Sequence, residues 1–324
     1  MEKKYESEEI KEEAIKLQGL KSEISKVIVG QSYVVDRIII GLLCNGHVLL
    51  EGVPGLAKTT LVKTVSDAID LDFKRIQFTP DLLPADLIGT LVYNPKTHEF
   101  QTRKGPVFTN IVLADEINRA SAKVQSALLE AMQERQVTIG ENSFPLGKPF
   151  MVFATQNPID QEGTYHLPEA QVDRFIFKLI LNHLEREDEK EVLTRASKPS
   201  EVKAILKAKE VLALQDMVNH IYIDDKVVDY ILNIVFATRE PRKFKMDIDT
   251  LIEYGASPRA SLALHLASRA HAFLKKRHFV IPEDVKAVAP DILRHRILLT
   301  YEAEADNISS DEIIEKILMG IPTP

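Results

Sequence analysis

The hydrophobic pattern of the sequence changes near residue 183. Before that point, short apolar runs alternate with stretches of helical period. Most of these runs are almost continuously apolar, which is typical of parallel strands buried on both faces. They occupy residues 47–51, 74–78, 111–114, 150–154 and 175–181. Because helical stretches lie between them, the pattern predicts a doubly wound α/β domain with a parallel sheet.

Helical patterns occur on both sides of this change. Near the N-terminus, apolar residues from Ile10 to Leu20 recur every three or four positions, and residues 59–69 and 122–135 also indicate helices. After residue 183 we find helical patterns and no convincing strand. The helical stretches there are residues 185–194, 214–220, 225–239, 261–276, 282–289 and 310–318.

Length and composition agree with this division. The 324 residues suffice for about two domains. We expect an N-terminal helix in residues 1–19, an α/β core in residues 20–182 and an all-α domain in residues 183–324. Hydrophobic residues make up 45% and charged residues 27%, so disordered, collagen-like and coiled-coil classes are excluded. Cys44 is the only cysteine, which excludes intrachain disulfides and cysteine-rich zinc sites.

The charge and the N-terminal residues bear on partners and location. With 41 Lys and Arg against 48 Asp and Glu, the formal net charge is −7, which argues against coating nucleic acid through bulk positive charge. Residues 1–13 lack the apolar centre of a signal peptide. No apolar run approaches the roughly 20 residues that span a bilayer. We therefore expect a cytoplasmic protein without membrane insertion.

A glycine-rich segment lies between the first predicted strand and the helix after it. Its residues are Gly52, Val53, Pro54, Gly55, Leu56, Ala57, Lys58, Thr59 and Thr60. Glycines let backbone N–H groups approach a phosphate, and a helix N-terminus favours an anion. Lys58 would reach the β- and γ-phosphates, and the Thr59 hydroxyl would bind Mg²⁺. The alternative is an ordinary Gly/Pro turn before a lysine-bearing helix.

Ala57 departs from the usual phosphate-loop pattern, G-x-x-x-x-G-K-[ST], which has a second glycine at its position. We expect a helix-compatible backbone there, which tolerates the methyl group. The departure weakens the motif when it is considered alone.

The strand at residues 111–114 ends in two acids, Asp115 and Glu116. The carboxyl ends of strands are where open α/β sheets bind ligands. Asp115 would hold the Mg²⁺ shell, and Glu116 would orient or deprotonate an attacking water. The alternative is a buried strand that ends in solvated acids, which is less common beside a phosphate loop.

Further polar residues follow later strands or begin helices. The amide of Asn157 could bind both a γ-phosphate and the attacking water, or Asn157 could simply form a turn before Pro158. Arg174 could stabilise the charge of phosphoryl transfer, within its own subunit or on a neighbour, or could form a surface ion pair. Arg259 lies in the first turn of a predicted helix and could equally face solvent. The basic segment 294–296 is typical of a solvated helical face.

Together, these segments resemble the MoxR branch of the AAA+ ATPases. The resemblance covers essentially residues 20–300, and the form of the phosphate loop, including Ala57, agrees with this branch. The segments that carry it are residues 52–59, 113–120, 128–137, 154–158, 162–175 and 257–260.

The resemblance implies roles for individual residues, with ATP and Mg²⁺ as cofactors. Lys58 and Thr59 would be the Walker A pair, and Asp115 and Glu116 the Walker B pair. The remaining assignments are Asn157 as sensor 1, Arg174 as the arginine finger on the neighbouring subunit's nucleotide, Arg259 as sensor 2, and Gly30 and Gln31 as the lining of the adenine pocket.

The resemblance also implies an architecture and an activity. The fold would be a P-loop AAA+ αβα core with a five-stranded parallel sheet, followed by an all-α lid. Two hairpins, within residues 87–104 and 136–146, would project toward a substrate channel or remain solvated. The chain would assemble as a ring, expected to be a hexamer, and hydrolyse ATP to remodel or mature a protein complex. A von Willebrand factor A domain protein is often the partner.

Two other functions remain open. One is a nucleic-acid-remodelling motor, since related rings translocate DNA, although the net charge of −7 disfavours it. The other is a nucleotide-dependent scaffold that binds ATP and hardly hydrolyses it.

Overall fold

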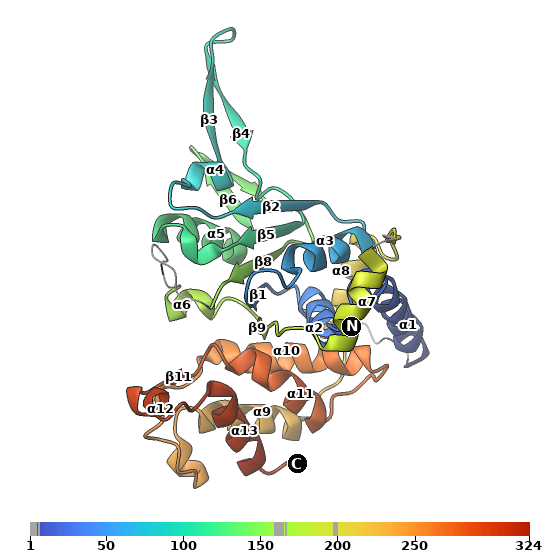
Figure 1. Cartoon of the computed structure of the whole chain (residues 1–324), viewed down its shortest axis with the longest axis vertical. Helices are drawn as coiled ribbons and strands as arrows, with labels where there is room; N and C mark the ends of the chain where they lie inside the picture. Colours follow the sequence, from blue (N-terminus) through green and yellow to red (C-terminus); the bar gives the residue numbers. More distant parts are fainter. Residues whose placement is uncertain (1–4, 6, 159–164, 166, 197–199) are drawn as a thin grey trace.

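The computed structural model describes residues 5, 7–158, 165, 167–196 and 200–324 (Figure 1). A five-stranded sheet lies at the centre of the core, with strand order β2-β5-β8-β1-β9 and parallel pairing throughout. The strands are β1 (Val48–Glu51), β2 (Phe73–Gln77), β5 (Ile111–Asp115), β8 (Met151–Gln156) and β9 (Phe177–Ile180). Each coincides with one of the predicted apolar runs, which confirms the parallel α/β core.

Both faces of the sheet are covered. Successive side chains of a strand point to opposite faces, so Leu50 and Leu113 belong to one hydrophobic cluster and Leu49 and Val112 to a second. The first cluster extends without a break into the C-terminal helices, where it includes Ile292. The second packs against the helix α5 (Ala122–Glu134).

The helices of the core include one that we did not predict. Helix α1 (Ser7–Ile24) and helix α3 (Lys58–Ala68) agree with the sequence pattern. Helix α2 (Ser32–Leu43) was missed, because the sheet and other helices surround it and nine of its 12 residues are buried. Its polar side is narrow, with Ser32 and Asp36 one turn apart, so the apolar positions around it dominate the pattern.

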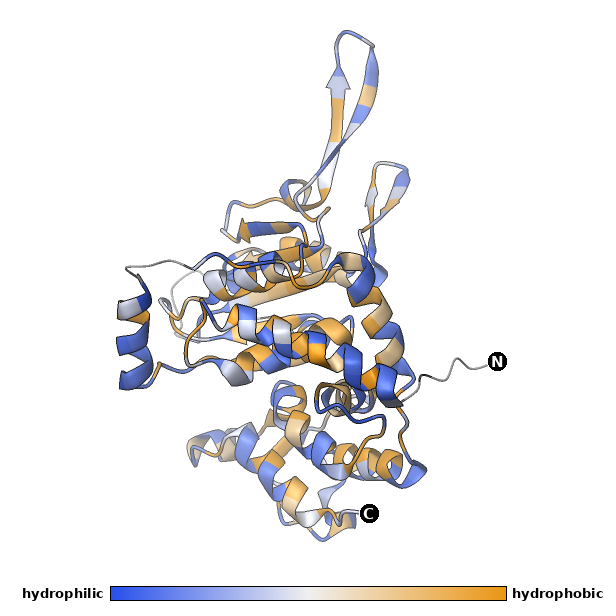
Figure 2. Cartoon of the chain, turned by 90° about the vertical axis from the view of Figure 1, so that its right-hand side faces the viewer, coloured by the Kyte–Doolittle hydropathy of each residue, from blue (hydrophilic) through white to orange (hydrophobic). Residues whose placement is uncertain are grey.

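Two hairpins project from the end of the core that is opposite the C-terminal helices (Figures 1 and 2). They are formed by β3 (Gly89–Asn94) with β4 (Glu99–Lys104), and by β6 (Gln136–Ile139) with β7 (Asn142–Pro145). Both agree with the predicted positions. Leu91, Tyr93 and Phe100 on the longer hairpin are exposed. The short helical elements of the core are α4 (Pro84–Ile88), η1 (Ile117–Arg119) and α6 (Glu169–Val172).

The C-terminal part of the chain is mostly helical, and its elements from α9 onward lie below the sheet in Figure 1. Helix α7 (Arg186–Ala196) flanks the core, and α8 (Ala208–Asn219) packs against both α2 and α10. We call the remaining elements the lid. They are α9 (Asp225–Ala237), η2 (Pro241–Phe244), β10 (Ile252–Tyr254), α10 (Pro258–Leu274), α11 (Pro282–Leu293), β11 (Leu298–Leu299), α12 (Tyr301–Ala305) and α13 (Ser310–Gly320).

The expectation that no strand follows residue 183 was wrong in one place. Strands β10 and β11 form a small antiparallel pair. With three and two residues they are too short to produce an alternating pattern. The predicted division of the chain near residue 183 stays a prediction, because α8 packs against core and lid alike.

Candidate functional site

The predicted phosphate-binding segments meet at one edge of the sheet. The register pairs Glu51 with Gln156 and Gln77 with Asp115, so β1, β8, β5 and β2 end side by side. The phosphate loop follows β1, the two acids end β5, and half-buried Asn157 follows β8. This edge is where open parallel sheets bind ligands. The structure therefore brings the predicted Walker A, Walker B and sensor 1 segments together.

The backbone of the phosphate loop corrects one expectation. Ala57 has φ 53° and ψ 26°, which is the left-handed region, and not the helix-compatible conformation that we expected. This conformation explains why the usual phosphate-loop pattern has glycine at this position, since a side chain there costs roughly 1–2 kcal/mol. Gly55 also has a positive φ, of 94°. Helix α3 begins directly after Ala57, with its N-terminus directed at the loop.

Lys58 lies over the loop that precedes it. Its Nζ donates a hydrogen bond to the carbonyl of Gly52. Burial lowers the pKa of Lys58, whereas Asp115, Glu116 and Glu51 favour its charged form. An anion bound in the loop would favour the charged form further.

A cavity of about 670 Å³ lies beside the phosphate loop. Its size lies within the ordinary range for small-molecule sites. The lining residues come from the segment before α2, from the loop itself and from the region of α7. They are Val27, Ile28, Val29, Gln31, Pro54, Gly55, Leu56, Ala57, Thr60, His183, Leu184, Glu189, Val192 and Leu193.

The segment of Gly30 and Gln31 is packed closely against this site. The Gln31 side chain donates to the carbonyl of Leu56 at 3.5 Å. Gly30 has φ 71°, and a Cβ placed there would lie 2.4 Å from Oδ2 of Asp188 in α7. The mostly apolar walls beside a loop of N–H groups suit a flat aromatic base that carries phosphates.

The two strand-end acids are held by side chains from neighbouring strands. Thr155 donates from Oγ1 to Oδ1 of Asp115 at 2.6 Å and accepts from the N–H of Glu116 at 2.8 Å. Arg75 donates from Nη2 to Oδ2 of Asp115 at 2.6 Å. Glu116 Oε2 accepts from Gln77 Nε2 at 2.9 Å. Glu116 itself has φ 56°, which is the left-handed region.

The sequence analysis missed Arg75, Gln77 and Thr155 as site residues. A signal existed for the first two, because they lie two positions apart in a predicted strand and so share a face. Their partners depend on the order of the strands, which the sequence did not provide. Arg119 was missed as well; it donates from Nη1 to Oε2 of Glu116 at 3.0 Å.

The oxygen atoms at this edge fit a magnesium ion. The Thr59 hydroxyl lies in the first turn of α3, and the Asp115 carboxylate ends β5. Mg²⁺ in nucleotide sites takes one or two such protein oxygens together with phosphate oxygens and water. In the described part of the chain no group of three or more His, Cys, Asp or Glu could hold a metal ion.

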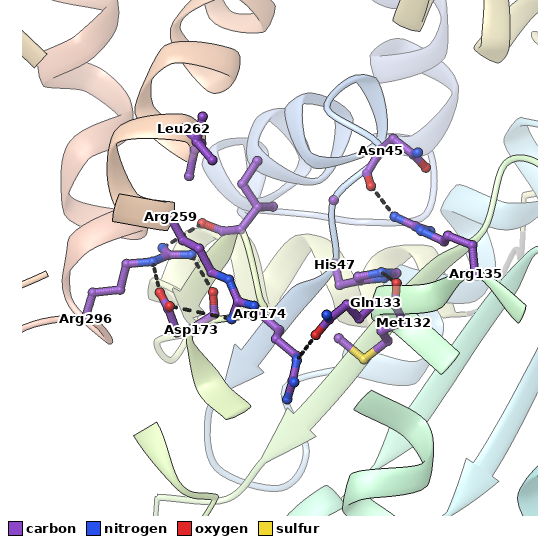
Figure 3. Close-up of a pocket in the computed structure, with 13 residues that line it drawn as sticks. Asn45, His47, Met132, Gln133, Arg135, Asp173, Arg174, Arg259, Leu262 and Arg296 are labelled. Carbon is purple, nitrogen blue, oxygen red and sulfur yellow. Dashed lines mark hydrogen bonds and ion pairs between the residues drawn. The ribbon is translucent and has the colours of Figure 1, made fainter. Parts of the chain in front are cut away.

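Arg174 and Arg259 lie together in a second cavity, of about 280 Å³ (Figure 3). Arg174 follows α6 and donates from Nε to Oε1 of Gln133 at 2.9 Å. Nη1 of Arg259 lies 3.7 Å from Oδ2 of Asp173. Arg135 and Arg296 also line this space, which we call the arginine pocket. Among the described residues that line the cavity beside the phosphate loop, neither Arg174 nor Arg259 occurs.

Arg296 is buried and the other two residues of the basic segment 294–296 are half-buried, so the expectation of a solvated face was wrong. The Arg296 residue is 6% exposed, and Arg294 donates to the carbonyl of Lys178 at 2.7 Å. Burial lowers the pKa of Arg296 to about 10, against the effect of Asp173. Both arginines bind backbone carbonyls of β9 or of the segment before it, which a sequence pattern cannot reveal.

The segment 162–175, which carries part of the resemblance, is described only in part by the structure. Residues 162–164 and 166 lie outside the described residues. In the described part of the chain, no helix combines the length and the apolar character that a membrane span requires.

Fold and site together define a class of protein. A five-stranded parallel sheet, a phosphate loop after β1, paired acids after β5 and a helical lid are the parts of an AAA+ ATPase. Residues 47–177 match the model of the ATPase family associated with various cellular activities (AAA), and residues 245–317 match the AAA lid domain.

Relatives identify the family within this class. Chaperone MoxR1 of Mycobacterium tuberculosis is 50% identical over 304 residues, which cover 93% of this chain and 81% of that protein. Protein MoxR of Methylorubrum extorquens is 29% identical, with 93% of each chain covered. A crystal structure of a predicted ATPase from Cytophaga hutchinsonii has 51% identity and a TM-score of 0.92, with 98% of each chain covered. The chain belongs to the MoxR family of AAA+ ATPases.

The left-handed conformation of Ala57 leads to a prediction about stability. Ala57→Gly relieves roughly 1–2 kcal/mol of strain in the folded state. It also stabilises the unfolded state by about 0.4–1 kcal/mol, because glycine gives the unfolded chain more conformational freedom. We therefore expect an unchanged or slightly greater free energy of unfolding. The control Ala127→Gly, in the right-handed helix α5, should lose about 1 kcal/mol. Urea unfolding measures both. A clear loss of stability in Ala57→Gly would contradict the left-handed conformation.

Thr155 provides a second prediction. Thr155→Val keeps the shape but removes the hydroxyl that serves Asp115 and the N–H of Glu116, so we expect a loss of about 1–3 kcal/mol in the free energy of unfolding. Thr155→Ser retains the hydroxyl and should lose less. Equal stabilities of the Val and Ser variants, measured by chemical denaturation, would show that these hydrogen bonds contribute little.

Proposed function

We propose that this chain is a Mg²⁺-dependent ATPase that works in a ring and uses ATP to remodel or mature a protein complex. The observation that carries the proposal is the meeting of the phosphate loop, Asp115, Glu116 and Asn157 at one sheet edge, beside a cavity that suits a base. The name of the relative MoxR1, a chaperone, supports the type of work.

ATP would lie across the phosphate loop with its base in the neighbouring cavity. The base contacts the segment of Val29, Gly30 and Gln31, which packs on the loop through Leu56. The phosphates accept hydrogen bonds from the backbone N–H groups of residues 52–59, except Pro54, which has none, and face the N-terminus of α3. Lys58 leaves the carbonyl of Gly52 and binds the β- and γ-phosphates.

Hydrolysis would use the acids at the end of β5. Thr59 and Asp115 would hold Mg²⁺, which neutralises charge on the phosphates. Glu116 orients the attacking water, and the amide of Asn157 binds the γ-phosphate. Because Gln77 and Arg119 both donate to Glu116, the carboxylate is oriented before water arrives. The role of Thr155 is to keep the two acids in a fixed relation.

A ring follows from the place of the arginines. Arg174 and Arg259 share the arginine pocket, and among described residues neither lines the nucleotide cavity of its own chain. We therefore assign both arginines to the nucleotide of the adjacent subunit, where their charge stabilises phosphoryl transfer. Closure of such a head-to-tail contact gives a ring, for which we propose six subunits.

The client of this ring is proposed to be a protein. The net charge of −7 disfavours nucleic acid. The hairpin of β3 and β4 exposes Leu91, Val92, Tyr93 and Phe100, and such apolar side chains suit contact with an unfolded or partly exposed protein segment. A von Willebrand factor A domain protein is the partner class that we would test first.

The nucleotide roles can be tested with two substitutions. Lys58→Ala should abolish ATP binding, whereas Glu116→Gln should keep it and lower phosphate release by about 10²-fold or more. Binding of a fluorescent ATP analogue and phosphate release measure the two effects. Lys63→Ala, an exposed lysine on the same helix, is the control. Unchanged turnover in Glu116→Gln would exclude the enzyme; wild-type turnover that is barely detectable would favour the scaffold.

Mixed rings test the assignment of Arg174 to the neighbouring site. Arg174→Ala subunits retain their own nucleotide residues, and Glu116→Gln subunits retain their arginine. Each variant alone should be inactive, and mixing them should restore part of the ATPase rate, because some sites then combine an intact Glu116 with an intact Arg174. If mixed rings form, shown by mass spectrometry, and no activity returns, Arg174 does not act on the neighbour.

A further inference from the structure

Asp173 is the residue at which three side chains of the lid meet the core. Its Oδ1 accepts from Nε of Arg296 at 2.7 Å, and its Oδ2 accepts from Oγ of Ser257 at 2.8 Å. Nη1 of Arg259 lies 3.7 Å from the same Oδ2. Ser257 caps α10 and Arg259 lies in its first turn, whereas Arg296 follows α11. The carboxylate of Asp173, the residue directly before Arg174, therefore contacts two segments of the lid (Figure 3).

Arg296 also holds the backbone on both sides of Arg174. Its Nη2 donates to the carbonyl of Asp173 at 3.0 Å and to that of Phe175 at 2.6 Å, and its Nη1 donates to that of Ile176 at 3.3 Å. The Arg296 side chain is only 2% exposed. A buried lid side chain thus sets the position of the backbone that carries Arg174.

The contact of Arg259 with Asp173 is looser than that of Arg296. Its 3.7 Å separation is longer than a hydrogen bond, and the Arg259 side chain is 46% exposed. Arg259 can therefore turn toward an anion in the arginine pocket while the Asp173–Arg296 contact is retained. Arg174 remains in place meanwhile through its hydrogen bond to Gln133.

We propose that Asp173 is a positioning residue: through Arg296 it transmits the orientation of the lid to Arg174, so that Arg174 and Arg259 reach the adjacent subunit's phosphates together. This inference rests on the proposed action of both arginines on the neighbour. Asp173 touches no nucleotide itself. Its effect is on the geometry of the two arginines, and a lid movement that shifts Arg296 moves Arg174 with it.

Asp173→Asn tests this role because it keeps the shape and one oxygen acceptor but removes the charge that pairs with two arginines. The affinity of each subunit for ATP should stay within about twofold, while kcat falls about 10- to 100-fold, as expected for a misplaced catalytic group. Glu169→Gln is the matched control, since it removes the charge of an exposed acid on α6. Its kcat should equal that of the unchanged protein.

Mixed rings distinguish positioning from a general structural defect. Asp173→Asn subunits mixed with Glu116→Gln subunits should regain activity, because an intact Arg174 then faces an intact site. The same subunits mixed with Arg174→Ala subunits should regain none, since both lack a working arginine. Arg296→Lys keeps a charge for Asp173 but cannot reach the three carbonyls. Arg296→Lys should therefore be rescued by Glu116→Gln subunits and not by Arg174→Ala subunits. It serves as the test variant if Asp173→Asn does not fold.

Three results would overturn the inference. One is a kcat for Asp173→Asn within about twofold of the unchanged protein. Another is a loss of ATP affinity that accounts for the whole loss of turnover. The third is failure of Asp173→Asn to be rescued by Glu116→Gln when Arg174→Ala is rescued by it. If Arg174→Ala is not rescued either, the proposed action on the neighbour fails first, and this inference falls with it.

Discussion

Burial of the central sheet on both faces is the constraint on which the rest of the structure depends. Val112, Leu113 and Ala114 in β5 are fully buried, with neighbouring side chains directed to opposite faces. An unpaired charge inside such a sheet would cost far more than it could contribute. In the inner strands β1, β5 and β8, charged groups therefore appear only where the strand ends. The parallel register brings these ends to one edge, and Asp115 and Glu116 lie there for that reason.

The same constraint explains what the sequence could predict. The inner strands β1, β5 and β8 are short apolar runs because both of their faces are covered. All five strands were found, and the phosphate loop and the acids could be placed relative to them. Helix α2 was missed because most of its side chains are buried and its polar side is narrow. The pair β10 and β11 was missed because its strands are shorter than the period that would reveal them. In both cases the alternation of polar and apolar positions is too limited to be detected from the sequence.

Contacts that depend on the order of the strands or on backbone acceptors could not be predicted. Thr155 and Arg75 hold Asp115 only because β8 and β2 are the neighbours of β5, and strand order is not written in a local pattern. Arg296 looked like a surface residue because its acceptors are backbone carbonyls, which every sequence contains. The conformation of Ala57 was also misjudged, since alanine gives no sign of a positive φ. For Asp115 and Arg296, the contacting groups are distant in the sequence or belong to the backbone. For Ala57, no side chain indicates the conformation.

Buried ion pairs join the lid to the core beside the hydrophobic cluster that also extends between them. Arg37 of α2 pairs with Asp291 of α11 with side chains 7% and 0% exposed, and Arg296 pairs with Asp173. Such pairs add little net stability, because desolvation offsets most of the attraction, yet breaking one costs about 3–5 kcal/mol. Apolar surfaces can slide past one another gradually, whereas these pairs form in one relative position and are lost in others. The lid is thus held in a defined orientation to the edge strand β9 and to Arg174, and a change in that orientation requires these contacts to be exchanged for others.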